Sequence, residues 1–376
     1  MSVYLKQDEP DNANRLDNMR QGVLGTDASR IEGLLKVTGT APYAAEYQLD
    51  DCLEGVIVTA TIPKGEVTRI DADSVLSMPG VVTVIDDPAL IARPAQGTAG
   101  EAAEQPARKV GYFGQPIALV VAETFEQARD AAKHLSVSYR EDDDAAFDPE
   151  AVEAETKDGA TSQGDLAHAM KVAAASVDQT YRTEGHSSAA MEPHAAIAQG
   201  DGDALTVYAS LQMLNYNISE LADSLGLDED KVRLVSRYVG GGFGSKLGIS
   251  EETVAASVAA MKLERPVRVA MLRQQVLQCI MRRSETTQKL RLASDEEGKL
   301  DGFAHHALVS NLPGEEFAEP VLQSSHFLYG GENRQLKLEV ARIHRMTAGS
   351  VRAPGEAVGM PALEVAMDML AEKSGV

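Results

Sequence analysis

The sequence predicts an α+β protein built from two folded modules. At 376 residues, of which 44% are hydrophobic, the chain is long enough for more than one core. Short strand-like runs are mixed with helical stretches on both sides of residues 141–164, without an internal repeat. The segment 141–164 itself is acidic and lacks a strong apolar period, which is typical of an exposed linker between domains.

The first module is predicted to span residues 28–140, after a polar N-terminal arm at 1–27. The run IALVVA at 117–122 is apolar at every position, which indicates a strand buried on both faces. Thr124 then suits the N-cap of a helix, with Gln127 completing a capping box. Strands are expected at 56–61, 81–85, 117–122 and 136–139, and the helix at 124–135.

The second module is predicted to span residues 165–376. Val254, Val258 and Met261 recur on one helical face after the N-cap candidate Ser250, so this helix should lay one face on a core. Helices are expected at 165–175, 217–226, 251–264 and 356–373, and strands at 176–181, 195–199, 204–210, 231–236 and 301–310.

The charge of the chain excludes several classes of partner. Its 57 acidic and 35 basic residues give a formal charge of −22, which repels nucleic acid and anionic membranes. No apolar run approaches the roughly 20 residues that span a bilayer, so no membrane insertion is expected. The start of the chain has neither a signal-peptide pattern nor a twin arginine. We therefore expect a cytoplasmic protein, with co-export to the periplasm by a signal-bearing partner as the alternative.

Cysteine usage limits the redox chemistry of the chain. The two cysteines, Cys52 and Cys279, cannot supply the four ligands of a common iron–sulfur cluster or of the usual structural zinc site. Free thiols in a reducing compartment are expected, with a disulfide as the alternative. Any electron relay must therefore lie on another chain.

The strongest local feature is the run Gly240-Gly241-Gly242-Phe243-Gly244-Ser245-Lys246, which follows a predicted strand. Glycines at this density let the backbone approach a ligand closely, and successive N–H groups can form an anion nest. Ser245 breaks the spacing of both the dinucleotide-binding and the P-loop fingerprints. A ligand site and a tight strand-to-helix turn are both open, and the aromatic Phe243 favours the site.

A second candidate segment is Arg352-Ala353-Pro354-Gly355-Glu356. An arginine on a rigid Pro-Gly turn can present its planar fork to an oxyanion. Glu356 suits either a helix-capping or a site role. Further along, Pro361 should kink the last helix or reset its start, and Gly375 suits its C-terminal cap.

Histidines give only weak indications of a metal site. His186, Glu192 and His194 lie close in sequence, but Pro193 breaks the helical spacing of a zinc motif, so a structural polar cluster is favoured. The pair His305-His306 lies in a predicted strand, where its members must point to opposite faces.

Taken together, these segments resemble the xanthine dehydrogenase/aldehyde oxidase family of molybdenum hydroxylases. RIEGLLKVTGTAPYAAEY and FGQPIALVVAETFEQARDAA resemble its a/b hammerhead domain. MEPHAAIA, GGGFGSK and VRAPGEAVGMPALEVAMDMLAEKSGV resemble successive motifs of its first molybdenum-cofactor-binding domain. The resemblance runs in order from Arg30 to Val376, and NLPGEE and LYGGENRQ favour the bacterial periplasmic aldehyde oxidoreductase type.

The resemblance implies roles for individual residues. Gln212, at the end of a predicted strand, matches a glutamine beside the molybdenum, and Gly241 to Gly244, Phe243 included, match the loop over the cofactor. Arg352 matches an arginine at the molybdenum face of the pocket, and Arg283 is a looser match to a substrate-orienting arginine. Leu247 stands where purine-oxidising members carry a glutamate, so with Phe243 it predicts an apolar substrate pocket suited to aldehydes.

The same resemblance implies cofactors and partners. Molybdenum would be held by a molybdopterin dithiolene, in the cytosine dinucleotide form, without a protein ligand, and would oxidise aldehydes to carboxylic acids with oxygen from water. A [2Fe-2S] subunit, an FAD subunit and the second half of the large subunit, which carries a general-base glutamate, are expected partners. The chain is then a truncated or naturally split large subunit. A hydroxylase of N-heteroaromatic compounds and a non-catalytic scaffold are the alternatives.

Overall fold

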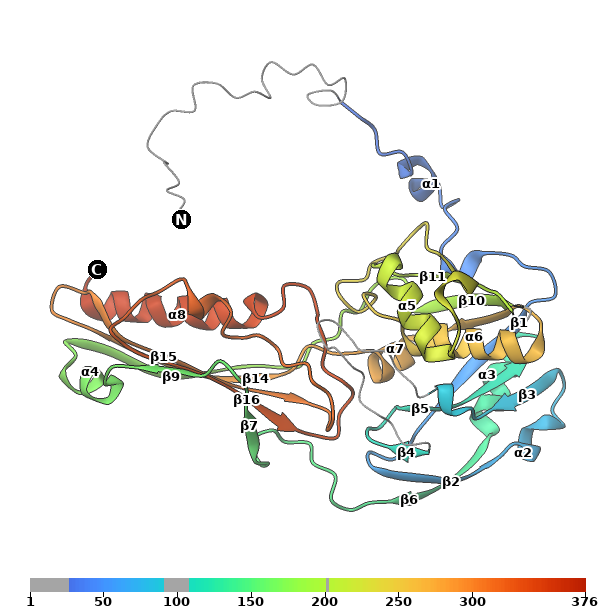
Figure 1. The fold of residues 1–376 in the computed structure, drawn as a ribbon, viewed down its shortest axis with the longest axis horizontal. Helices are drawn as coiled ribbons and strands as arrows, with labels where there is room; N and C mark the ends of the chain where they lie inside the picture. Colours follow the sequence, from blue (N-terminus) through green and yellow to red (C-terminus); the bar gives the residue numbers. More distant parts are fainter. Residues whose placement is uncertain (1–26, 91–107, 201–202) are drawn as a thin grey trace. The chain divides into compact units, whose positions relative to one another are not determined.

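The computed structural model describes residues 27–90, 108–200 and 203–376 (Figure 1). The chain divides into two compact units, Met1–Ala41 and Pro42–Val376. The described part of the first unit holds the short helix α1 (Gly33–Val37). The predicted polar arm at 1–27 lies, apart from Asp27, outside the described residues. Everything that follows concerns the unit Pro42–Val376.

A seven-stranded mixed sheet contains strands from both predicted modules. Its order is β12–β11–β10–β13–β1–β5–β3. β1 pairs in parallel with β13, Leu53 opposite Val267, so one continuous sheet joins sequence before residue 140 to sequence after residue 165. The strands are β1 (Leu53–Thr59), β3 (Val81–Ile85), β5 (Pro116–Ala122), β10 (Ala195–Gly200), β11 (Leu205–Ala209), β12 (Val232–Val235) and β13 (Val267–Ala270).

The strand β5 is buried at every residue, as its apolar run predicted. The helix α3 (Phe125–His134) follows it and packs on β1 and β5. Thr124 Oγ1 accepts the Gln127 N–H at 3.3 Å, and Gln127 Oε1 accepts the Thr124 N–H at 3.0 Å. The predicted capping box is therefore confirmed.

The helix α6 (Glu251–Leu263) packs against β10 and β13 and is buried at every residue from Glu251 to Ala260. Val254 and Val258 are buried in the core and Met261 packs against it, so the predicted core face is confirmed, but the burial extends to the other faces as well. Its other faces carry alanine, serine and threonine, which are small enough for neighbouring elements to approach from every side. Ser250 does occupy the N-cap position, although its side chain makes no capping hydrogen bond. The helices α5 (Leu214–Leu225) and α7 (Arg273–Cys279) flank this layer.

A three-stranded sheet of order β4–β2–β6 adjoins β5 through a small apolar core. Val67 and Val110 meet Ile117 of β5 there. Its strands are β2 (Gly65–Asp71), β4 (Lys109–Val110) and β6 (Ser136–Glu141), and the short helix α2 (Asp73–Leu76) follows β2.

A six-stranded sheet of order β7–β16–β15–β14–β9, with β8 also on β16, forms the second large layer. The helix α8 (Glu356–Ser374) runs along one face of it (Figure 1), where Leu363 and Ala366 pack with Leu290 and Phe303. The remaining elements are α4 (Leu166–Val172), β7 (Ala154–Thr156), β8 (Thr161–Gln163), β9 (Ala175–Thr183), β14 (Thr286–Ser294), β15 (Leu300–Asn311) and β16 (Asn333–Arg342).

Three details of this layer bear on the sequence predictions. The strands β7 and β8 lie within residues 141–164, so the acidic segment is mostly exposed but also extends the sheet. α8 begins at Glu356 and contains Pro361, so the proline does not reset its start, and Gly375 at φ 72° caps its end as expected. His305 is buried against Gln288 and Ser325, whereas His306 lies on the other face of β15.

Short 3-10 turns complete the fold at Ala44–Glu46, Pro88–Leu90, Glu229–Lys231 and Ser324–His326. In the described part of the chain, no helix combines the length and the apolar character that crossing a membrane requires.

The buried carboxyl of Glu252 makes the stability of this fold depend on pH. Burial raises its pKa to about 7, with the neighbouring Glu251 carboxylate adding to the rise. The folded chain therefore keeps a proton that the unfolded chain releases above about pH 4.5, so this group lowers the stability as the pH rises from about 4.5 to about 7, after which the loss levels off.

We predict that Glu252→Gln matches the wild type in free energy of unfolding at about pH 4 and exceeds it at about pH 8 by up to about 3 kcal/mol. Urea unfolding at both pH values measures this. The buried His194 and His305, whose pKa values burial lowers to about 4, titrate in both proteins and cancel in the comparison. The exposed Glu297→Gln is the control. A difference that does not change with pH would contradict the assignment.

Candidate functional site

The candidate residues meet at one edge of the seven-stranded sheet. The strands β11 and β12 are parallel neighbours, so their carboxyl ends lie together. Gln212 follows β11, and the loop 240–246, which we call the glycine loop, follows β12. β10 is antiparallel to β11, so the segment 191–194 that precedes it reaches the same edge. The sheet topology therefore brings Gln212, the glycine loop and residues 191–194 together at one edge of the sheet.

The backbone of the glycine loop takes conformations that few residues tolerate. Gly241 and Gly244 have φ values of 103° and 102°, and Phe243 has a φ of 53°. A Cβ on Gly242 would lie 2.1 Å from Gln212 Oε1, and one on Gly244 would lie 2.1 Å from the Ser350 carbonyl. Glycine at these positions is required by close packing on both sides of the loop.

Gln212 holds the loop from one side. Its N–H donates to the Lys246 carbonyl at 2.8 Å, and its Oε1 accepts the N–H groups of Gly244 at 3.2 Å and Lys246 at 3.3 Å. Its side-chain nitrogen donates to no described residue, and the residue is exposed. The carboxamide thus fixes the loop with its oxygen and keeps its nitrogen available for a ligand.

The second candidate segment, residues 350–355, packs directly on the glycine loop. The Arg352 N–H donates to the Phe243 carbonyl at 2.8 Å. The Arg352 side chain is exposed and forms no hydrogen bond or ion pair with a described residue. The predicted residues Gln212, Gly241 to Gly244 and Arg352 are therefore neighbours, although up to 140 positions separate them in sequence.

Arg283 is placed differently from the predicted substrate-orienting role. Its guanidinium is 3% exposed and pairs with the fully buried Glu319 at 2.6 Å. It also donates to the carbonyls of Val351 at 3.0 Å and Ala353 at 3.4 Å, and to that of Arg352. Because these contacts occupy the guanidinium N–H groups of Arg283, this side chain supports segment 350–355 instead of facing a ligand.

The carboxyl of Glu319 completes this support. Its Oε1 accepts the Gly355 N–H at 2.7 Å as well as the Arg283 hydrogen bond. Burial raises the pKa of Glu319, and the Gly355 N–H and the Arg283 charge oppose that rise. Sequence reasoning missed Glu319, because only its position beneath Gly355 distinguishes it from the acidic residues around it.

Below the glycine loop, Glu192 and His194 act as the structural polar cluster that was favoured. His194 Nε2 lies 3.0 Å from the Ser245 carbonyl, and Glu192 pairs with Lys246 at 3.0 Å. His186 is joined to Arg283 through backbone pairing. Among the described residues, no three histidine, cysteine, aspartate or glutamate side chains are grouped as metal ligands.

Leu247 and Phe243 were the predicted substrate-pocket residues. Phe243 projects outward, 43% exposed. Leu247 is half-buried, and its carbonyl accepts a hydrogen bond from Asn217 Nδ2 at 2.7 Å. The structure therefore places the aromatic ring on the exposed side of the loop and Leu247 at the loop's inner end.

The site presents donors without acceptors. The N–H groups of Gly242 and Phe243 donate to no described residue. The Gln212 amide nitrogen and the Arg352 guanidinium also donate no hydrogen bond to a described residue. Four unpaired donors along two adjoining loops suit an oxygen-rich, anionic ligand.

Two family models match the chain. The molybdopterin cofactor-binding domain matches residues 148–376, and the a/b hammerhead domain of aldehyde oxidase and xanthine dehydrogenase matches residues 38–143. The predicted order of a hammerhead domain and then a molybdenum-cofactor-binding domain is therefore confirmed.

The similar proteins are longer than this chain. The aldehyde oxidoreductase molybdenum-binding subunit PaoC of Escherichia coli is 38% identical over 99% of this chain and 51% of its own length. The nicotinate dehydrogenase large molybdopterin subunit of Eubacterium barkeri is 27% identical over 74% of this chain and 68% of its own length. The chain thus spans about half to two thirds of these relatives.

Solved structures give the same picture. The aldehyde oxidoreductase from Desulfovibrio gigas aligns with a TM-score of 0.81 and 26% identity over 92% of this chain and 42% of that one. Quinoline 2-oxidoreductase from Pseudomonas putida 86 aligns with a TM-score of 0.82 and 21% identity over 94% of this chain and 48% of that one.

We predict that Arg283→Met lowers the free energy of unfolding by about 3–5 kcal/mol, because it leaves the Glu319 carboxyl buried without its partner. Urea denaturation measures the loss. Arg69→Met, at an arginine whose side chain is 69% exposed, should cost less than about 1 kcal/mol. Equal losses in the two variants would show that the buried pair does not support segment 350–355.

Proposed function

The chain belongs to the aldehyde oxidase and xanthine dehydrogenase family, and from this premise we propose that it forms the molybdopterin-binding part of an aldehyde oxidoreductase. The observation that carries the proposal is the set of unpaired donors on the glycine loop, Gln212 and Arg352. The chain spans only 51% of the Escherichia coli relative, so activity, substrate and partners are proposed for the whole enzyme that contains it.

The residues present fit molybdopterin. Molybdopterin would bring anionic oxygens such as those of its phosphate, and the N–H groups of Gly242 and Phe243 are unpaired donors that would hold such oxygens. A side chain at position 242 would fill the space beside Gln212 Oε1, so the loop is shaped for backbone approach.

In the proposed mechanism the cofactor supplies the two-electron oxidation of the aldehyde carbon, with water as the source of oxygen. The side chains of this chain bind and orient. The Gln212 amide nitrogen and the two free backbone N–H groups fix the cofactor's oxygens, and Arg352 provides positive charge for developing negative charge at the reacting centre. Phe243, exposed beside them, offers an apolar surface to the substrate.

Aldehydes are proposed as substrates on two grounds. The similar Escherichia coli protein is named an aldehyde oxidoreductase subunit. In addition, Leu247 stands where purine-oxidising members carry a glutamate, whose carboxylate would favour a polar purine. N-heteroaromatic compounds are the second candidate, since nicotinate dehydrogenase and nicotine 6-hydroxylase subunits are also similar, each at 27% identity.

The remaining components are proposed on the partners. We place the [2Fe-2S] cluster and FAD on other subunits, and the general-base glutamate on the second half of the large subunit. Neither Cys52 nor Cys279 is part of a disulfide, and a cytoplasmic location is proposed for the chain. The cytosine dinucleotide form of molybdopterin is proposed from the family resemblance.

Arg352→Ala should separate function from stability. The side chain is exposed and unpaired, so the thermal midpoint should not change, while kcat/KM for an aromatic aldehyde should fall roughly 10–100-fold through loss of a charge-assisted contact. The measurement uses the holoenzyme that contains this chain. Arg233→Ala, at an exposed arginine of β12, is the matched control.

Unchanged aldehyde turnover in Arg352→Ala would contradict the role of Arg352. A holoenzyme that oxidises nicotinate but no aldehyde would reject the substrate class and keep the cofactor site. Absence of molybdenum from the purified, folded holoenzyme, measured by elemental analysis, would reject the proposed function as a whole.

A further inference from the structure

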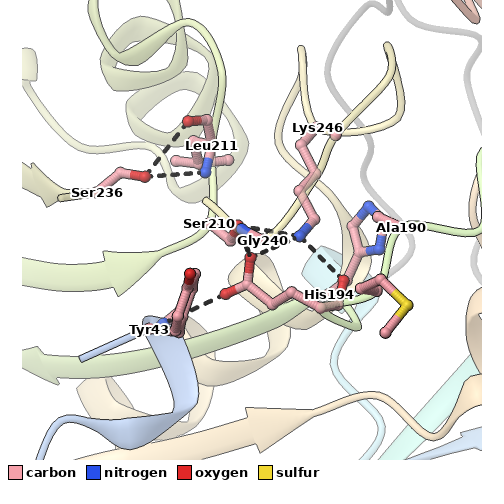
Figure 2. Close-up of polar contacts among 12 residues, drawn as sticks. Tyr43, Ala190, His194, Ser210, Leu211, Ser236, Gly240 and Lys246 are labelled. Carbon is pink, nitrogen blue, oxygen red and sulfur yellow. Dashed lines mark hydrogen bonds and ion pairs between the residues drawn. The ribbon is translucent and has the colours of Figure 1, made fainter. Parts of the chain in front are cut away.

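A charged lysine is completely buried directly behind the glycine loop. The Lys246 side chain is 0% exposed, and its Nζ donates to Glu192 Oε2 at 3.0 Å, the Glu192 carbonyl at 3.1 Å and Ser210 Oγ at 3.0 Å. Figure 2 shows the Lys246 amine pointing toward Ser210. All three ammonium protons therefore have acceptors inside the protein.

The Glu192 carboxylate binds the other end of the same loop. Its Oε2 accepts the Gly240 N–H at 2.6 Å and the Ser210 hydroxyl at 2.6 Å, in addition to the Lys246 amine. Gly240 begins the glycine loop and Lys246 ends it (Figure 2). One carboxylate oxygen thus joins the two ends of a seven-residue loop.

His194, two residues further along, holds the loop at a third point. Its Nε2 lies 3.0 Å from the Ser245 carbonyl, which can only accept, so the ring is protonated on this nitrogen. Burial lowers the pKa of His194 to about 4, so the ring is neutral at physiological pH. The segment 191–194 therefore contacts the loop at its start, near its end and at its last residue.

We propose that Glu192 and Lys246 are positioning residues that hold the glycine loop closed, so that the N–H groups of Gly242 and Phe243 stay directed at the cofactor. The identity of that ligand rests on the proposed function, whereas the holding of the loop rests on the contacts above. A pair that served only to balance charge would have no need of the Gly240 N–H, which Glu192 also binds.

Three variants separate loop positioning from charge balance. Glu192→Gln leaves the Lys246 ammonium buried without its counter-charge. Lys246→Met leaves the carboxylate with the Gly240 N–H and the Ser210 hydroxyl. The double variant Glu192→Gln/Lys246→Met is neutral but no longer ties the loop's end to its start. Each is prepared in the holoenzyme, and hydrogen–deuterium exchange of residues 240–247, the thermal midpoint and the molybdenum content are measured.

We expect Glu192→Gln to lower the thermal midpoint by roughly 5–10 °C. The double variant should recover to within about 3 °C of the wild type, because neither buried charge remains. Exchange at residues 244–247 should nevertheless stay at least roughly tenfold faster than in the wild type, since the side-chain link from the loop's end to its start is lost and only Gln212 and His194 still hold this part of the loop. Its molybdenum content should fall below about half of the wild-type value, the loss that a more than roughly tenfold weaker cofactor affinity produces when the wild-type site is about 90% occupied.

A double variant with wild-type exchange at residues 244–247 would overturn the proposal and leave charge balance as the pair's role. If Glu192→Gln does not fold, Ser210→Ala replaces it, because it removes one contact from each partner without unpairing a charge. It should speed exchange of the loop and leave the thermal midpoint within about 3 °C. Unchanged loop exchange in Ser210→Ala and the double variant would also count against the proposal.

Ser257→Ala is the matched control, since Ser257 is a buried serine whose hydroxyl bonds within α6 and does not touch the loop. A failure of the proposed function and a failure of the loop-positioning proposal give different results. A wild-type holoenzyme without molybdenum would reject the function, while the exchange measurements would still decide whether Glu192 and Lys246 position the loop.

Discussion

The candidate site depends on two buried ion pairs that hold two strained loops in contact. The glycine loop places Phe243 at φ 53°, and segment 350–355 places Ala353 at φ 55°. Each such residue costs about 1–3 kcal/mol and persists only where its surroundings fix it. Lys246–Glu192 lies beneath the first loop and Arg283–Glu319 beneath the second. The hydrogen bond from the Arg352 N–H to the Phe243 carbonyl joins them at 2.8 Å.

This arrangement explains why the donors of the site remain unpaired. The Glu192 carboxylate is used by Gly240 and Lys246 at the two ends of the glycine loop, and the Glu319 carboxyl is used by Gly355 in the adjoining segment. The N–H groups of Gly242 and Phe243 lie between Gly240 and Lys246 and have no described acceptor. A rigid loop with fixed, unpaired donors is preorganised for an anionic ligand, because little reorganisation is needed when the ligand arrives.

Sequence reasoning predicted several elements of the fold, because these leave local signals. The apolar run of β5, the capping box of α3 and the glycine density of the loop are visible in a few consecutive residues. Gln212 and Arg352 were identified through the family resemblance, and sheet topology brings both to the glycine loop.

The supporting residues left no such signal. Glu192 precedes Lys246 by 54 positions, and Glu319 follows Arg283 by 36, so each pairing becomes evident only once the strands are assembled. The burial of α6 on all sides was missed for a related reason. Its small residues, alanine above all, permit close contact from every direction. Which elements make those contacts is decided by the tertiary fold and not by the helix sequence.

The most direct test of this account is a crystal structure of the holoenzyme that contains this chain, with diffraction recorded at the molybdenum absorption edge. The account predicts an anomalous peak beside the Gln212 amide nitrogen, within contact distance of the glycine loop, and the Arg352 side chain turned toward it. A peak at a position remote from both loops, in crystals that hold molybdenum, would contradict it.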